Sequence, residues 1–255
     1  MMRALLFRAS LVLLAAAGGS ARADGLADMK AALARASAEA APLRATVDAR
    51  SWRKRGAGSE ADEERGQAAL AFEQGARGLV VTHDRELLAR SDAEQRARAR
   101  NPDSKSPTVM AMDELGLQEL AGLASSAAVL LRKVERGVYR GERAEAWQGR
   151  PARVLRFDMP ITTLSSRDRK YARQFKAELD VWIGADGMPL ASRLRQSSSG
   201  RAFVVVSFET AFEEDCVYAL AGERLFTSRK ETRSRASGAG EAEERRVVTA
   251  LSLQS

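Results

Sequence analysis

Apolar residues recur along the chain at two different spacings, one typical of helices and one typical of strands. This spacing predicts most of the secondary-structure elements. Within residues 24–41 the apolar residues recur at helical spacing, which predicts an amphipathic helix that Pro42 ends. Residues 43–50 instead alternate apolar with polar or charged side chains, the pattern of a strand with one buried side. Residues 68–72 and 79–82 predict two more strands across a glycine-containing turn, so the chain begins with a helix and a three-strand meander.

Helical spacing returns in the middle of the chain. Asp84 is placed to cap a helix that runs to Arg100 and has few apolar residues. The segment 101–107, Asn-Pro-Asp-Ser-Lys-Ser-Pro, predicts a loop, because its two prolines disfavour helix in their predecessors. A longer helix is predicted over 112–134, where an apolar stripe must pack against other apolar residues. The stripe consists of Leu120, Leu123, Ala127, Leu130, Leu131 and Val134.

From residue 137 onward, turn signals separate a series of predicted strands. The seven strands are predicted over 138–147, 152–159, 175–183, 190–197, 202–212, 217–229 and 247–253. Successive strands with tight turns imply an antiparallel sheet, and their alternation gives it one consistently apolar side. The acidic run 213–215 is interpreted as part of a solvated loop. With the three early strands the sheet has roughly ten, enough for twist and curling.

Residues 1–23 have the three parts of a cleavable secretory signal peptide. Two arginines form the positive start, residues 11–17 form a short apolar centre, and Ala-Arg-Ala at 21–23 forms the cleavage signal. The apolar run is shorter than the roughly 18 residues that a membrane-spanning helix needs. We therefore expect export to the periplasm and a mature protein with a single domain over 24–255.

Charge and cysteine content narrow the class of function. Loss of residues 1–23 removes three arginines and no acid, so the formal net charge falls from +7 to +4. The remaining basic residues are interspersed with acidic ones, which is typical of a solvated surface, and we expect no nucleic-acid partner. An anionic membrane surface is retained as an alternative partner. Cys216 is the only cysteine, so no internal disulfide can form, and its apolar neighbours indicate a buried core residue.

The sequence contains no pattern of a catalytic or cofactor site. His83 is the only histidine, so a histidine-based metal site or triad would have to be completed by carboxylates and Cys216. The glycine loops that bind phosphate or dinucleotides are absent, as are the H-E-x-x-H and G-x-S-x-G motifs. A hydrolase would need a cluster of acids around His83 or Cys216 in a cleft. We expect a non-enzymatic protein without cofactor or metal.

One hairpin motif and the order of the elements resemble a known family. The segment Trp182-Ile183-Gly184-Ala185-Asp186-Gly187-Met188-Pro189 follows a predicted strand. It is similar to the strand, W-I-D, loop, G-x-P, strand hairpin of the periplasmic outer-membrane lipoprotein carrier superfamily, although Gly184 replaces the more frequent Asp. The resemblance spans roughly residues 26–253. It implies an α+β fold, a curved antiparallel half-barrel (incomplete β-barrel) of roughly ten strands with helices closing the concave face.

Such a fold predicts binding without covalent chemistry. The apolar side of the sheet and the helical stripe form either a packed core or a ligand cavity, and both alternatives use the same residues. We expect a monomer that holds lipid, lipoprotein acyl chains or apolar polypeptide. The alternative is an envelope structural or interaction protein with a filled core, which binds a protein partner through a sheet edge or a basic surface. The predicted lining residues are Leu155, Phe157, Leu179, Val181, Ile183, Val204, Val206 and Phe208, with Leu120 and Leu123 in the covering helix.

Overall fold

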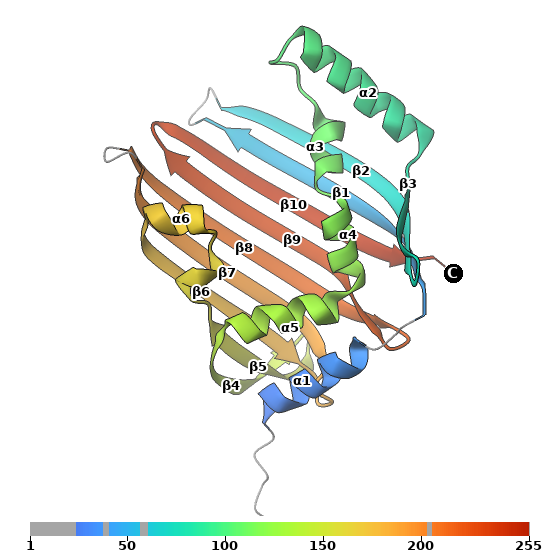
Figure 1. Cartoon of the computed structure of the whole chain (residues 1–255), viewed down its shortest axis with the longest axis vertical. Coiled ribbons are helices and arrows are strands. Elements are labelled where there is room, and N and C mark those ends of the chain that lie inside the picture. The colour runs from blue at the N-terminus through green and yellow to red at the C-terminus, as the bar shows by residue number, and fades with distance from the viewer. Residues whose placement is uncertain (1–23, 38–40, 57–60, 203–205, 255) are drawn as a thin grey trace, which may run out of the picture.

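A single antiparallel sheet of ten strands organises the chain (Figure 1). The computed structural model describes residues 24–37, 41–56, 61–202 and 206–254. The spatial order of the strands is β3-β2-β1-β10-β9-β8-β7-β6-β5-β4, and the sheet is not closed. The strands are β1 (Leu43–Arg55), β2 (Asp62–Gly75), β3 (Gly78–Thr82), β4 (Val138–Trp147), β5 (Arg150–Asp158), β6 (Ala172–Ile183), β7 (Pro189–Ala202), β8 (Val206–Ala221), β9 (Arg224–Gly238) and β10 (Glu241–Leu253).

The pairing of β1 with β10 joins the N-terminal strands to the C-terminal ones. Its register runs from Ala45 opposite Leu253 to Arg55 opposite Glu243. Every other pair of neighbours in the sheet is consecutive in the sequence. The expected antiparallel sheet of roughly ten strands is therefore confirmed, with one long-range pairing between its third and fourth strands in spatial order.

The predicted break between the strands 202–212 and 217–229 is wrong. The acidic run 213–215 lies in the middle of β8, which continues to Ala221, and the turn to β9 falls at residues 222–223. Glu214 is buried, whereas Glu213 and Asp215 face the opposite side of the sheet and pair with arginines of β7 and β9. These carboxylates are accommodated in a strand because cations on the neighbouring strands compensate their charges.

Side-chain caps mark the starts of α1 and α2. A side-chain oxygen of Asp24 caps α1 and accepts hydrogen bonds from the backbone N–H groups of Leu26 and Ala27. A side-chain oxygen of Asp84 caps α2 and accepts from the backbone N–H of Glu86. These two helices are confirmed. The described helices are α1 (Gly25–Ala36), α2 (Arg85–Arg100), α3 (Pro107–Asp113), α4 (Leu117–Ala124), α5 (Ser126–Arg136), the 3-10 helix η2 (Ile161–Thr163) and α6 (Ser166–Tyr171).

The single long helix predicted over 112–134 is wrong, because the chain forms α3, α4 and α5 in its place. Gly116 and Ser125 have non-helical backbone angles and separate the three helices. Figure 1 shows α3 and α4 one after the other in front of the strands around β1 and β10, while α5 turns away from them toward α1. The breaks let one apolar stripe follow two differently oriented parts of the sheet, which a straight helix of that length cannot do.

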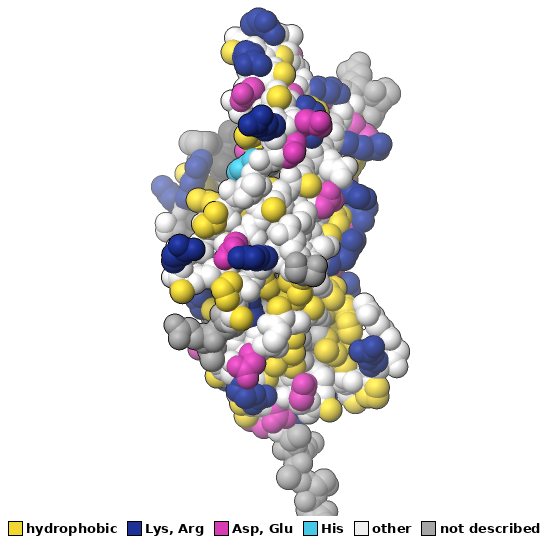
Figure 2. Space-filling model, turned by 90° about the vertical axis from the view of Figure 1, so that its right-hand side faces the viewer, with side chains coloured by type: hydrophobic (Ala, Val, Ile, Leu, Met, Phe, Trp, Pro, Cys, Tyr) yellow, Lys and Arg dark blue, Asp and Glu magenta, His cyan; other side chains and the backbone are white. Residues whose placement is uncertain are grey.

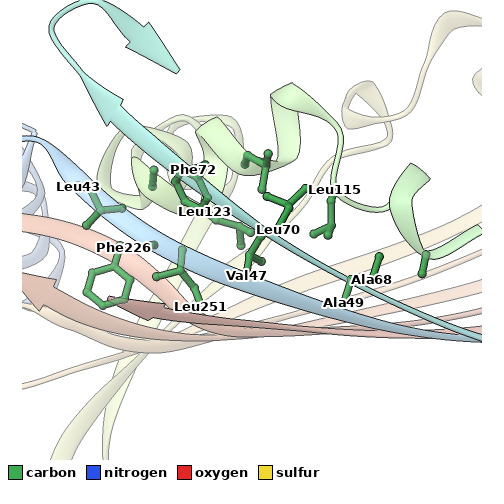
Figure 3. Packing of buried hydrophobic residues seen from close by; sticks show 14 of the residues in the cluster. Leu43, Val47, Ala49, Ala68, Leu70, Phe72, Leu115, Leu123, Phe226 and Leu251 are labelled. Atoms are coloured by element: carbon green, nitrogen blue, oxygen red, sulfur yellow. The ribbon is translucent and has the colours of Figure 1, made fainter. Parts of the chain in front are cut away.

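Two apolar clusters separate the sheet from the helices on one side, which we call the helix side. The β1 cluster lies under α3 and α4 and includes Val47, Leu70 and Leu251 (Figure 3). The β6 cluster lies under α1 and α5 and includes Leu179 and Val181. A third, smaller cluster around Trp182 occupies the opposite side of the sheet near β4.

Charged residues dominate the side of the sheet without helices. Asp180 pairs with Arg156 and Arg195 of the two adjacent strands, at 3.1 Å in both cases. Glu231 pairs with Arg233 and Arg246 at 2.6 and 2.8 Å. Figure 2 shows Lys and Arg side chains along the right-hand margin of the molecule with acidic side chains among them. These charged side chains keep a broad surface of the sheet hydrated, and their cross-strand ion pairs favour the observed register of the strands.

The contact between β2 and α3 depends on Gly66. A Cβ at this position would overlap the backbone carbonyl of Pro107 at the start of α3. We expect Gly66→Ala to lower the free energy of unfolding by about 1–3 kcal/mol, because α3 must move off the sheet. Gly122→Ala is the control, since its Cβ would lie 3.8 Å from Val129 and alanine favours helix. Urea unfolding measures both variants, and equal stability of Gly66→Ala and the parent chain would contradict this packing.

Candidate functional site

The structure divides the predicted lining residues between the two apolar clusters. Leu155, Phe157, Leu179, Val181 and Ile183 are at most 1% exposed and belong to the β6 cluster. They pack there with apolar residues of α1 and α5. The predicted covering residues, Leu120 and Leu123, are also buried but belong to the β1 cluster. The chain thus uses α5, and not α4, to cover the lining residues of β5 and β6.

The remaining predicted lining residues lie farther along the sheet. Val204 lies outside the described residues, and the structure describes the backbone of Val206 but not its side chain. Phe208 is half-buried. Phe212 is half-buried as well. It faces the helix side because it lies two residues before Glu214 in β8, and Glu214 contacts α5. Neither phenylalanine belongs to the packed clusters.

This part of the helix side has less helical cover. In Figure 1 no helix lies in front of the halves of β8 and β9 between α3 and α6. Phe175 of β6 is half-buried there and packs against the edge of the β6 cluster. Three phenylalanines, Phe175, Phe208 and Phe212, therefore lie partly accessible on the helix side next to a fully packed apolar cluster.

A chain of charged residues crosses from α4 to α5 between the two clusters. Lys230 of β9 donates to both carboxylate oxygens of Glu119 in α4, at 2.9 and 3.0 Å. The same Nζ lies 3.2 Å from Oε2 of Glu214 in β8. Glu214 in turn accepts a hydrogen bond from Lys133 of α5. We call Glu119, Lys133, Glu214 and Lys230 the polar seam.

The charges of the polar seam stabilise one another. Burial opposes ionisation of Glu214, but Lys133 and Lys230 outweigh it and keep the pKa of this carboxyl below its ordinary value. Burial likewise opposes the charge on Lys230, yet Glu214 and Glu119 raise the pKa of its ammonium group. Both groups are therefore charged at neutral pH, and each helix is tied to the sheet by an ion pair.

Neutral hydrogen bonds lie beside these ion pairs. The hydroxyl oxygens of Ser126 and Thr227 are 2.6 Å apart and both side chains are buried, which joins the first residue of α5 to β9. Cys216 is buried, as expected, and burial raises the pKa of its thiol to about 12. The thiol is therefore protonated at neutral pH and is not an activated nucleophile.

A cleft of about 770 Å³ opens along the polar seam between α4, α5, β8 and β9. Two further hollows, of about 450 and 700 Å³, lie over β6–β9 on the side of the sheet without helices. Small side chains such as Ser197 and Ala211 lie in these hollows among longer charged residues, including Lys176 and Arg235. The cleft is thus the largest of these three spaces, and it opens on the helix side.

In the described ranges, no group of three or more His, Cys, Asp or Glu residues is arranged so that it could hold a metal ion. His83 is exposed directly after β3. Across the same described residues, no helix combines the length and the apolar character needed to cross a bilayer.

No family model, curated protein or solved structure matches this chain. The resemblance to the lipoprotein carrier superfamily therefore stays a prediction from the sequence.

Sequence reasoning missed the polar seam, although two signals point to it. Glu214 occupies the same phase of β8 as Phe212 and Cys216, so an acid stands on an apolar side. Lys133 follows Leu130 by three residues and lies next to the apolar stripe of α5. A charged side chain on an apolar side of a strand or helix requires a partner of opposite charge. The acid Glu214 and the base Lys133 are therefore candidate partners of each other.

Replacement of Glu214 tests the polar seam. We expect Glu214→Gln to lower the free energy of unfolding at neutral pH by about 2 kcal/mol or more, because two half-buried ammonium groups lose the buried carboxylate between them. Since the folded pKa of Glu214 is lowered, its contribution is complete above the ordinary carboxyl value of 4.5 and is lost as the pH falls through the folded value. The gap between the parent chain and the variant must therefore close in acid.

Glu213→Gln is the matched control, since Glu213 is the neighbouring carboxylate on the opposite, solvated side of β8. Its surface pairs contribute about 0–1 kcal/mol. Chemical unfolding followed from neutral to acidic pH measures both variants. An equal effect of the two substitutions, or a Glu214→Gln gap that does not change with pH, would contradict the assignment.

Proposed function

We propose that the protein is an exported, non-enzymatic binding protein that holds lipid, lipoprotein acyl chains or apolar polypeptide against the helix side of its sheet, as the resemblance to periplasmic lipoprotein carriers implies. In this proposal the sheet is an incomplete barrel and the helix side is its concave face. The observation that carries the proposal is the accessible apolar surface of Phe175, Phe208 and Phe212 beside the β6 cluster.

Binding would begin at these phenylalanines, because they are apolar and partly accessible, whereas the lining residues of the β6 cluster are covered. An acyl chain that continues into the β6 cluster must replace the contacts of α5 with Leu155 and Leu179. Each methylene that leaves water contributes roughly 0.8 kcal/mol, so a chain of moderate length offsets the loss of these contacts. Such local opening also breaks the polar contacts of α5 with the sheet, Lys133 with Glu214 and Ser126 with Thr227.

The alternative function has its own supporting observation. Five predicted lining residues are at most 1% exposed, which favours a filled core. In that case the protein is an envelope interaction protein that binds its partner through a sheet edge or a basic surface. Retention of an acyl ligand by the folded protein distinguishes the two functions.

Ligand retention can be measured by native mass spectrometry after expression of the full chain in an export-competent bacterial host. We expect the folded protein to retain a phospholipid- or acyl-sized mass and to take up a fluorescent fatty acid. Phe212→Asp should weaken this uptake about tenfold or more, because a carboxylate beside the acyl chain loses its hydration.

Ala211→Asp is the control, since it places the same charge one residue away on the side of the sheet without helices. It should leave uptake unchanged, and circular dichroism should show that both variants are folded. A folded protein with no bound mass and no fatty-acid uptake would refute the carrier function and favour the alternative. Equal effects of the two substitutions would refute the assigned side of the sheet.

A further inference from the structure

The basic residues around α6 have no ion-pair partners among the described residues. Four basic residues stand between positions 166 and 173 with a single acid, Asp168. All four are exposed, and within the described parts of the chain none of them forms an ion pair. These residues are Arg167, Arg169, Lys170 and Arg173.

The one acid in this segment is engaged in the cap of α6. The Ser165 hydroxyl donates to Oδ2 of Asp168 at 2.7 Å and accepts from the Asp168 backbone N–H at 3.1 Å. Asp168 therefore orders the start of the helix, and its Oδ2 lies 2.7 Å from the hydroxyl oxygen of Ser165. The segment keeps a surplus of positive charge.

One more exposed arginine extends this surface. Arg136 at the end of α5 donates to the backbone carbonyl of Thr163 at 3.3 Å, next to α6. Arg136 has no ion-pair partner among the residues that the structure covers. We call Arg136, Arg167, Arg169, Lys170 and Arg173 the α6 patch.

Other basic surfaces of the protein are compensated. On the strands, arginines such as Arg193 and Arg233 pair with acids of the adjacent strands. Helix α2 also carries arginines without ion pairs, but Glu86, Asp92 and Glu94 are interspersed with them along the same helix. The α6 patch therefore differs from α2 in local charge balance rather than in the number of cations.

Apolar surface lies beside the α6 patch. Ile161 of η2 is 39% exposed, and η2 contacts α6. Lys170 extends over the ring of Tyr171 with Nζ 5.7 Å from the ring centre. Cations next to exposed apolar and aromatic side chains suit the boundary between lipid headgroups and acyl chains, whereas a nucleic-acid backbone offers no site for Ile161.

We propose that the α6 patch binds the surface of an anionic phospholipid bilayer through its headgroup phosphates. The patch is built from α5, α6 and the first residues of β6, and it shares no residue with the phenylalanines of the proposed ligand site. Membrane binding and ligand retention can therefore fail separately.

The test is co-sedimentation of the protein with vesicles of phosphatidylglycerol and phosphatidylcholine in equal parts. We expect binding that weakens as salt is added and that is absent with phosphatidylcholine alone. Simultaneous substitution of Arg167, Arg169 and Lys170 by Gln should weaken partitioning about tenfold or more. The same variant should retain fatty-acid uptake, and Phe212→Asp should retain vesicle binding.

The control is the Gln substitution of Arg85, Arg96 and Arg100 in α2, which removes the same charge from another exposed helix. Equal losses in both triple variants would overturn the proposal, because net charge alone would then explain binding. Displacement by inorganic phosphate at matched ionic strength would identify a site for free phosphate and overturn the membrane assignment. Binding of a DNA duplex with the same residue dependence, in the absence of vesicle binding, would overturn it as well.

Discussion

The pairing of β1 with β10 is the interaction on which the rest of the structure depends. Val47 and Leu251 lie opposite each other although almost the whole described chain separates them in sequence. Without this pairing, β1–β3 would form a separate three-strand sheet of marginal stability. With it, one continuous surface of ten strands presents apolar residues on one side and ion pairs on the other.

Such a broad surface exceeds what the short helices can cover. Helices α3 and α4 cover the strands around β1, and α5 with α1 covers those around β6, so the core splits into two clusters. The polar seam lies where α4 meets α5 and ties both to β8 and β9. Beyond it, Phe208 and Phe212 remain partly accessible. The proposed function follows from this incomplete cover.

The elements with local signals could be predicted from the sequence, and those defined by distant contacts could not. Asp24 and Asp84 cap helices through their nearest neighbours, and the alternation in β6 identifies its apolar side. In contrast, the breaks at Gly116 and Ser125 depend on how the helices pack against the sheet. The Lys133–Glu214 pair depends on the register of β8 relative to α5, which no local pattern contains.

In the proposed function, an acyl chain is held firmly only when it enters the β6 cluster, and α5 must then separate from the sheet. Ser126 and Thr227, whose hydroxyl oxygens are 2.6 Å apart, offer a position for a disulfide in a Cys216→Ala background. In the Ser126→Cys, Thr227→Cys protein, the account predicts that oxidation abolishes fatty-acid uptake and that reduction restores it. The Ser126→Cys single variant should bind under both conditions. Undiminished uptake by the oxidised double variant, with its disulfide verified by mass, would contradict the account.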